Sequence, residues 1–130
     1  MNVLIVEDDV FSRKFMLKFL SKYGNCKTAE DGEAAVRMYK EAIENKQPYD
    51  LICLDIKMPK LDGYETLEQI RHYEEEKQFT RQQEVKVIMT SGMDTSANAN
   101  KAFELGCVAY TSKPIDIVQF DNLLQELQLI

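Results

Sequence analysis

The sequence lacks the cysteine pattern of a disulfide-stabilised or zinc-binding protein. Its 130 residues include three cysteines, Cys26, Cys53 and Cys107, which are odd in number, far apart and without a CxxC pair. We therefore expect no disulfides. We interpret the three side chains as small, buried apolar residues in a reducing cytoplasm.

The sequence also lacks an excess of positive charge. Sixteen lysines and arginines face 22 aspartates and glutamates, which leaves a net charge of -6. A non-specific DNA or RNA binder needs surplus positive charge, and an acidic protein docks poorly on anionic lipid, so we expect neither nucleic acid nor membrane as a partner. No apolar run approaches membrane-spanning length and no basic leader precedes the first apolar run, so we expect a soluble, cytoplasmic protein.

Short apolar runs alternate with longer amphipathic stretches over the whole chain, without repeats or a linker. The runs predict strands at 3–6, 27–29, 51–54, 85–90 and 108–111, and the stretches predict helices at 11–23, 35–43, 64–70, 99–105 and 117–127. Strands that are apolar throughout, separated by helices, imply a parallel sheet covered on both faces. We therefore predict an α/β fold: one doubly wound, five-stranded parallel sheet in a single domain over residues 1–130.

Several local expectations follow from the same pattern. Asp31 and Asp116 are expected to cap helices, and the polar segment 74–84 to form a solvated helix end and loop. The single histidine, His72, is expected to face solvent. The apolar residues at helical spacing are all expected in the core, among them Phe11, Phe15, Phe103 and Ile117.

Polar side chains stand where the predicted strands end. Glu7 and Asp8 follow the first strand, Asp55 the third, Ser91 the fourth and Lys113 the fifth. The carboxyl ends of parallel strands lie side by side and form the binding crevice of such folds. The sequence therefore predicts three carboxylates, one hydroxyl and one ammonium around a single pocket.

Clustered carboxylates must take up a proton or recruit a cation, since two unit charges 4 Å apart repel by about 4 kcal/mol at an effective dielectric near 20. A few hard oxygen ligands with room for water and phosphate suit Mg²⁺ (or Mn²⁺). A metal, a lysine and a hydroxyl can stabilise a transferring phosphoryl group, which makes Asp55 the best candidate nucleophile. The residues alone predict a divalent-metal phosphate site and leave open whether an aspartyl phosphate forms.

At these residues the sequence resembles the receiver domain of two-component response regulators (CheY-like). The resemblance covers essentially the whole chain in order, and rests on residues 6–9, 54–59, 62–63 and 89–92, on Tyr110 and on Lys113-Pro114. It implies the flavodoxin-like (βα)5 arrangement. It also implies a signalling protein rather than an enzyme, whose partner is a sensor histidine kinase or a histidine phosphotransfer protein.

The resemblance assigns a role to each site residue. Asp55 would accept a phosphoryl group from a phosphohistidine, and Lys113, joined to Pro114 by a cis peptide bond, would pair with the phosphoryl oxygens. Mg²⁺ (or Mn²⁺) would be bound by Asp8, by Glu7 through water, by Asp55 and by the backbone carbonyl of Lys57.

The resemblance also implies a two-state switch. Ser91 matches the switch hydroxyl, whereas Thr90 should point to the opposite side of its strand. Tyr110 matches an aromatic side chain that moves with Ser91. Together they would reshape a face for a downstream protein partner, built from the helix at 99–105, the strand at 108–111 and the helix at 117–127.

Two neighbouring positions predict slow loss of the phosphoryl group. Lys57 stands two residues after Asp55, and Met93 two residues after Ser91. In the family these positions help to place or exclude the hydrolytic water, and neither a cation nor an apolar thioether orients it.

The alternatives fit less well. A metal-dependent phosphohydrolase with a phosphoaspartate needs a second acid where Lys57 stands, and a nucleotide or flavin binder needs a glycine-rich loop in place of residues 7–9. A pseudo-receiver would not need the complete set of acceptor residues. No output domain follows the last predicted helix, so the chain is expected to act alone or to be a receiver fragment of a larger regulator.

Overall fold

A computed structural model describes residues 1–92 and 96–130. Its elements are β1 (Asn2–Val6), α1 (Val10–Leu20), the 3-10 helix η1 (Ser21–Tyr23), β2 (Asn25–Ala29), α2 (Gly32–Glu44), β3 (Leu51–Asp55), α3 (Gly63–Glu76), β4 (Lys86–Ser91), α4 (Ser96–Glu104), β5 (Ala109–Ser112) and α5 (Ile117–Glu126). None of the helices in this described part is long and apolar enough to cross a membrane.

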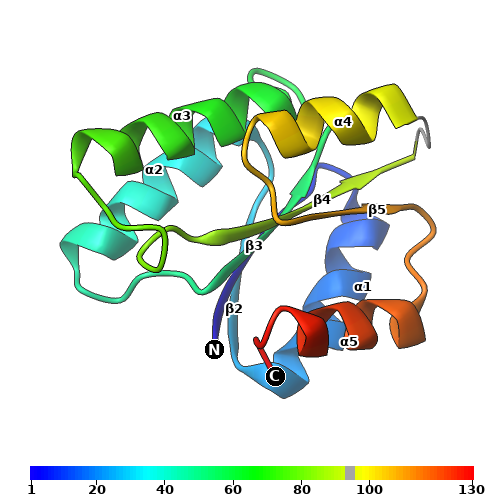
Figure 1. Ribbon diagram of the computed structural model, residues 1–130. Coiled ribbons are helices and arrows are strands. Elements are labelled where there is room, and N and C mark those ends of the chain that lie inside the picture. Colours follow the sequence, from blue (N-terminus) through cyan, green and yellow to red (C-terminus); the bar gives the residue numbers. More distant parts are fainter. Residues whose placement is uncertain (93–95) are drawn as a thin grey trace.

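The strands form one parallel sheet in the order β2-β1-β3-β4-β5. Helices α2, α3 and α4 cover one face, and α1 and α5 cover the other (Figure 1). The prediction of a doubly wound five-stranded sheet is confirmed. β3 is the central strand and all five of its residues are buried, so Asp55 ends the most enclosed strand of the sheet.

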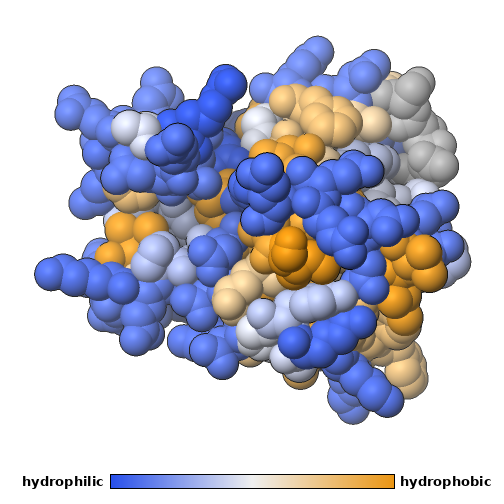
Figure 2. All heavy atoms as spheres, turned by 60° about the horizontal axis from the view of Figure 1, so that its bottom comes forward, coloured by the Kyte–Doolittle hydropathy of each residue, from blue (hydrophilic) through white to orange (hydrophobic). Residues whose placement is uncertain are grey.

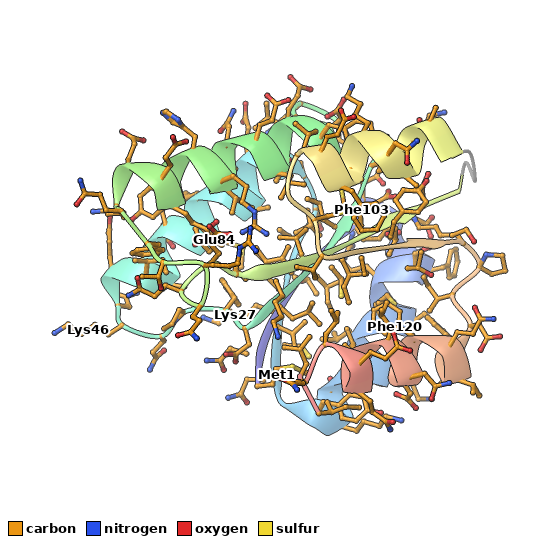
Figure 3. All side chains as sticks on the ribbon, viewed as in Figure 1. Met1, Lys27, Lys46, Glu84, Phe103 and Phe120 are labelled. Atoms are coloured by element: carbon orange, nitrogen blue, oxygen red, sulfur yellow. The ribbon has the colours of Figure 1, made fainter. Side chains whose placement is uncertain are left out.

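Each strand sends alternate side chains into two separate cores. Leu4, Ile52 and Met89 belong to the core beneath α2, α3 and α4. Ile5 and Cys53 belong to the core beneath α1 and α5, where Phe120 points from α5 toward the sheet (Figure 3). Glu7 and Asp55 continue the alternation of Ile5 and Cys53, so their side chains belong to the α1/α5 face.

Aspartates begin four of the helices. Each accepts a hydrogen bond from the backbone N–H three residues later; they are Asp9, Asp31, Asp62 and Asp116. The predicted caps Asp31 and Asp116 are confirmed. These bonds fix where each helix begins just beyond the carboxyl end of its strand, and so fix the shape of the loops at that edge.

The prediction that the apolar residues at helical spacing lie in the core is wrong for four of the residues it named. Phe11 is 83% exposed, and Phe15, Phe103 and Ile117 are also exposed. In the row of phenylalanines along α1, only Phe19 reaches the core, where its ring lies 5.6 Å from that of Phe120. The start of α1 stands at the carboxyl edge of the sheet, where nothing in the described residues covers the outer side of the helix.

The prediction for segment 74–84 is wrong at its first residue. Glu74 is only 2% exposed. Its carboxylate accepts hydrogen bonds from the Tyr39 hydroxyl at 2.7 Å and the Val85 N–H at 2.8 Å, and it pairs with Arg71 at 2.6 Å. Arg71 in turn donates to the Gly106 carbonyl through Nε and Nη2. His72, as predicted, is exposed.

We predict that Glu74→Ala lowers the free energy of unfolding by about 3 kcal/mol, because it leaves the buried Tyr39 hydroxyl and Val85 N–H without their acceptor and removes the charged partner of Arg71. Urea unfolding measures the loss. The matched control is Glu75→Ala, an exposed neighbour of the same type, expected within about 0.5 kcal/mol of wild type. Equal losses in the two variants would contradict the role given to Glu74.

Candidate functional site

The sequence-predicted acids meet at the carboxyl edge of the sheet. Glu7 and Asp8 follow β1 and Asp55 ends β3, and these two strands are neighbours. One carboxylate oxygen from each of the three residues lies within 4.8 Å of the other two. Glu7 and Asp55 are buried, whereas Asp8 is exposed at the mouth of the cluster.

Lys113 completes this cluster from the loop after β5. Its Nζ forms a close ion pair with Glu7 Oε1 and lies 3.3 Å from Asp55 Oδ1. Its backbone N–H donates to the Ser91 carbonyl at 2.7 Å, and the Lys113-Pro114 peptide bond is cis, as expected. One ammonium therefore serves two buried carboxylates.

The two buried carboxylates of the cluster are stabilised to different degrees by their neighbours, and their pKa values shift in opposite directions. Burial, together with the hydrogen bond and the charge of Glu7, raises the pKa of Asp55 to about 7, although Lys113 opposes this. Burial also raises the pKa of Glu7, but hydrogen bonds from Asp55 and Lys113 outweigh it and leave that pKa below its ordinary value. Burial lowers the pKa of Lys113, and Glu7 and Asp55 more than reverse this. A bound cation beside Asp55 would favour its charged form and lower this pKa again.

The donor set fits a magnesium ion. Three carboxylates supply hard oxygen ligands, and the exposed position of Asp8 leaves room for water molecules. Lys57 is exposed, two residues beyond Asp55, and the role of its backbone carbonyl as a ligand stays a prediction.

The two predicted switch residues lie near the site on β4 and β5. Ser91 is buried at the end of β4, and Tyr110 is half-buried against the core beneath α2, α3 and α4. Thr90 lines a cleft on the α1/α5 face, so the alternation of β4 places Ser91 on the other face, as expected. Met93 lies outside the described residues.

Comparison with known proteins decides the family. The model of the response regulator receiver domain matches residues 3–127. The chain belongs to the receiver domain family. It is thus the receiver domain of a two-component system, and receivers are generally signalling modules rather than enzymes.

Solved receivers share this fold at 27–30% identity. The receiver domain of Ssk1 from Saccharomyces cerevisiae, crystallised with the histidine phosphotransfer protein Ypd1, superposes with a TM-score of 0.84 at 30% identity, covering 97% of this chain and 87% of that one. The receiver domain of the histidine kinase CKI1 from Arabidopsis thaliana gives 0.85 at 27% identity, covering 99% and 90%.

Curated relatives are longer than this receiver. A probable cyclic di-GMP phosphodiesterase of Vibrio cholerae is 33% identical over 116 residues, covering 89% of this chain but only 24% of that protein. The probable transcriptional regulator ycf29 of Porphyra purpurea is 31% identical over 127 residues, covering 97% of this chain and 56% of that protein.

Sequence reasoning missed two features beside the acidic cluster. A cleft of about 400 Å³ runs from Glu7 and Lys113 down the α1/α5 face, and the exposed Phe11 and Phe15 form part of its wall. Arg13 donates to the Glu7 carbonyl at 3.0 Å. The only sequence signal for these features was the position of Phe11, Arg13 and Phe15, which lie on the first two turns of the helix that follows the acidic loop.

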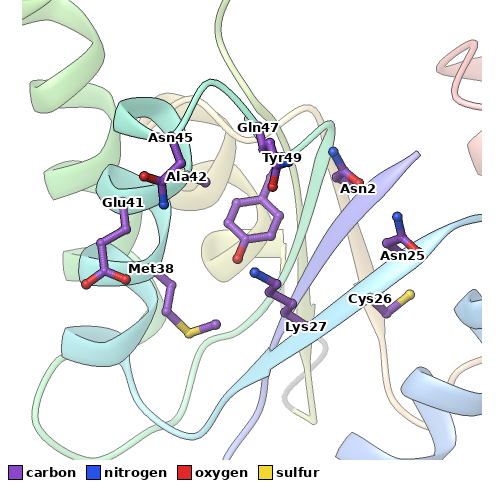
Figure 4. Close-up of a pocket in the computed structure, with 10 residues that line it drawn as sticks. All are labelled: Asn2, Asn25, Cys26, Lys27, Met38, Glu41, Ala42, Asn45, Gln47 and Tyr49. Atoms are coloured by element: carbon purple, nitrogen blue, oxygen red, sulfur yellow. The ribbon is translucent and has the colours of Figure 1, made fainter.

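A second pocket lies far from this chemistry. It has a volume of about 590 Å³ and opens between the amino ends of β1 and β2 and the end of α2 (Figure 4). Asparagine and glutamine amides, Lys27, Glu41 and Tyr49 line it, without a cluster of acids. The acidic cluster at the opposite end of the strands is the better candidate site.

We predict that Asp55→Asn stabilises the metal-free protein at pH 8 by about 2 kcal/mol. The pKa of Asp55 is higher in the folded state than its ordinary value of 3.8, so its ionisation costs folding stability as pH rises from about 4 through 7. The asparagine variant avoids this cost, and its advantage should shrink as pH falls from 7 toward 4. Urea unfolding in EDTA at pH 8 and pH 4.5 measures both differences. The exposed change Glu75→Gln is the control, and an advantage independent of pH would contradict the prediction.

Proposed function

We propose that Asp55 accepts a phosphoryl group from a phosphohistidine of a histidine kinase or a histidine phosphotransfer protein. The observation that carries this proposal is the position of Asp55: its carboxylate is buried, 3.3 Å from Lys113 Nζ, and grouped with two further acids. A carboxylate oxygen of Asp55 would bond to phosphorus while the bond from phosphorus to the imidazole nitrogen breaks. The electron pair of that bond stays on the imidazole.

Each neighbour of Asp55 has a part in this proposal. Asp8 and Asp55 would hold Mg²⁺ (or Mn²⁺) directly, Glu7 through water, and Lys57 through its backbone carbonyl. The bound metal would neutralise charge on the phosphoryl oxygens. Lys113 would pair with one of those oxygens, which moves its ammonium from Glu7 and Asp55 toward the new group.

The phosphorylated state would then favour a different arrangement of the switch face. Ser91 would be drawn toward the phosphoryl group and Tyr110 inward with it, so that α4, β5 and α5 present an altered surface to a downstream partner. Only contacts that differ between the two states can shift their populations, and a phosphoryl oxygen bonded to the Ser91 hydroxyl would be such a contact.

The exposed start of α1 suits a docking surface for the phosphodonor. Phe11 and Phe15 border the cleft that leads to Glu7 and Lys113. Figure 2, turned so that the side of α1 and α5 comes forward, shows hydrophobic side chains gathered along its right edge. The exposed lysines Lys14 and Lys18 lie on the same helix, so a partner with apolar residues and an acidic rim would match this surface.

We further propose that residues 1–130 form one receiver domain, which works alone or as part of a larger regulator. In the two curated relatives described above, the matching stretch makes up 24% and 56% of the protein, which supports the second arrangement. The free thiols of Cys26, Cys53 and Cys107 are consistent with a reducing, cytoplasmic compartment.

We predict that wild-type protein incubated with Mg²⁺ and acetyl phosphate gains the mass of one phosphate, and that EDTA prevents the gain. Asp55→Asn should remove it, because the proposed acceptor carboxylate is replaced by an amide, whereas Glu7 keeps its close ion pair with Lys113. Intact mass spectrometry reads the outcome. Asp50→Asn, an exposed aspartate just before the opposite end of β3, is the matched control and should still be phosphorylated. Phosphorylation of Asp55→Asn to the wild-type level would contradict the proposal that Asp55 is the phosphoryl acceptor.

We predict that Phe11→Ser together with Phe15→Ser slows phosphoryl transfer from phosphorylated Ypd1 at least tenfold, with transfer from acetyl phosphate unchanged. Loss of two aromatic contacts removes apolar burial in the complex, whereas the small donor needs none. Phe103→Ser on α4, another exposed phenylalanine, is the control. Equal slowing in the control, or a matching loss with acetyl phosphate, would count against docking at α1.

A further inference from the structure

Arg13, on the first turn of α1, binds the whole loop that carries the first two acids of the site. Its Nη1 donates to the Glu7 carbonyl at 3.0 Å and lies 3.4 Å from the Asp8 carbonyl. Its backbone N–H donates to the Asp9 carbonyl at 2.9 Å. The guanidinium thus contacts the carbonyl oxygens of two consecutive loop residues, and the third contact is the first regular hydrogen bond of the helix, which any residue at this position would make.

The guanidinium is also held from its other side. Arg13 Nη2 lies 3.4 Å from Glu30 Oε1, and the Arg13 side chain is only 16% exposed. Glu30 directly follows β2, so the guanidinium bridges the carboxyl ends of β1 and β2. A planar fork with several fixed donors suits this task better than the single ammonium of a lysine.

These contacts determine how the acids are presented. A carbonyl held in one direction fixes its peptide plane, and two successive fixed planes fix the direction of the side chain between them. The Glu7 N–H is held as well, by the Ala29 carbonyl at 3.0 Å. We infer that Arg13 is a positioning residue for the metal site: it holds the Glu7 and Asp8 peptides so that their carboxylates meet Asp55. This inference rests on the proposed binding of Mg²⁺.

The direction in which the Kd for Mg²⁺ changes when Arg13 is replaced distinguishes this role from a simple effect of charge. An arginine next to a cation site repels the cation, so its removal should tighten Mg²⁺ binding if charge were its only contribution. Loss of a group that orients metal ligands instead weakens binding, typically by 10- to 100-fold. The two mechanisms therefore predict opposite changes in Kd.

The test is a titration with Mg²⁺ alone, in which the backbone NMR signals of residues 7–9 report the binding and give the Kd. Arg13→Met should raise the Kd about tenfold, and Arg13→Lys, which keeps the charge but loses the fork, should fall between Arg13→Met and wild type. Lys14→Met is the matched control, because it removes an exposed cation from the adjacent position; its Kd should stay the same or fall.

A second measurement needs no metal. In EDTA, amide hydrogen exchange of the loop at 7–10 should be faster in Arg13→Met than in wild type and Lys14→Met, with the strands unchanged. If Arg13→Met does not fold, Arg13→Lys carries the test. A Kd that is unchanged or lower in Arg13→Met, or in Arg13→Lys if only that variant folds, overturns the inference. Wild-type protein that binds no Mg²⁺ would overturn the proposed function instead.

Discussion

Two buried carboxylates that share one lysine are the constraint on which the rest of the site depends. Glu7 and Asp55 lie at the ends of adjacent strands whose other residues, apart from Asn2, are apolar, so the sheet removes both from water while bringing them together. Lys113 is the closest cation and pairs more tightly with Glu7 than with Asp55. Asp55 is left as the acid that gains most from a proton, a metal ion or a phosphoryl group with its attendant metal.

Comparison with Glu74 shows why burial alone does not make an acid reactive. Both carboxylates are almost fully enclosed. Glu74 receives an arginine, a hydroxyl and a backbone N–H, all within 2.8 Å, whereas Asp55 has a shared lysine and a neighbouring acid. The first arrangement satisfies the charge and joins α2 and α3 to the residue just before β4. The second leaves a charge unsatisfied at an opening to solvent, which is where binding chemistry is expected.

The sheet and its acidic edge could be predicted because both depend on a strong local signal. An apolar run that stops at an acid marks the end of a buried strand, and parallel topology then brings the distant ends together. The exposure of Phe11 and the burial of Glu74 have no such local signal in the sequence. Helical spacing tells which residues share a face but not whether another element covers it, and the partners of Glu74 at Tyr39 and Val85 are 35 and 11 residues away. Arg13 is hidden for a similar reason, because its targets are backbone carbonyls, which every residue possesses.

The two faces of the sheet impose a requirement on the proposed switch. The acids and the cleft belong to the α1/α5 face, whereas the alternation of β4 places Ser91 toward the other side, where Tyr110 packs. A change at Asp55 must therefore pass around the end of the sheet to reach α4. The bond from the Lys113 N–H to the Ser91 carbonyl continues the pairing of β4 with the segment after β5 at this edge. The proposed switch therefore requires the Ser91 side chain to reach the phosphoryl group around the carboxyl end of β4, next to the backbone segment that carries Lys113.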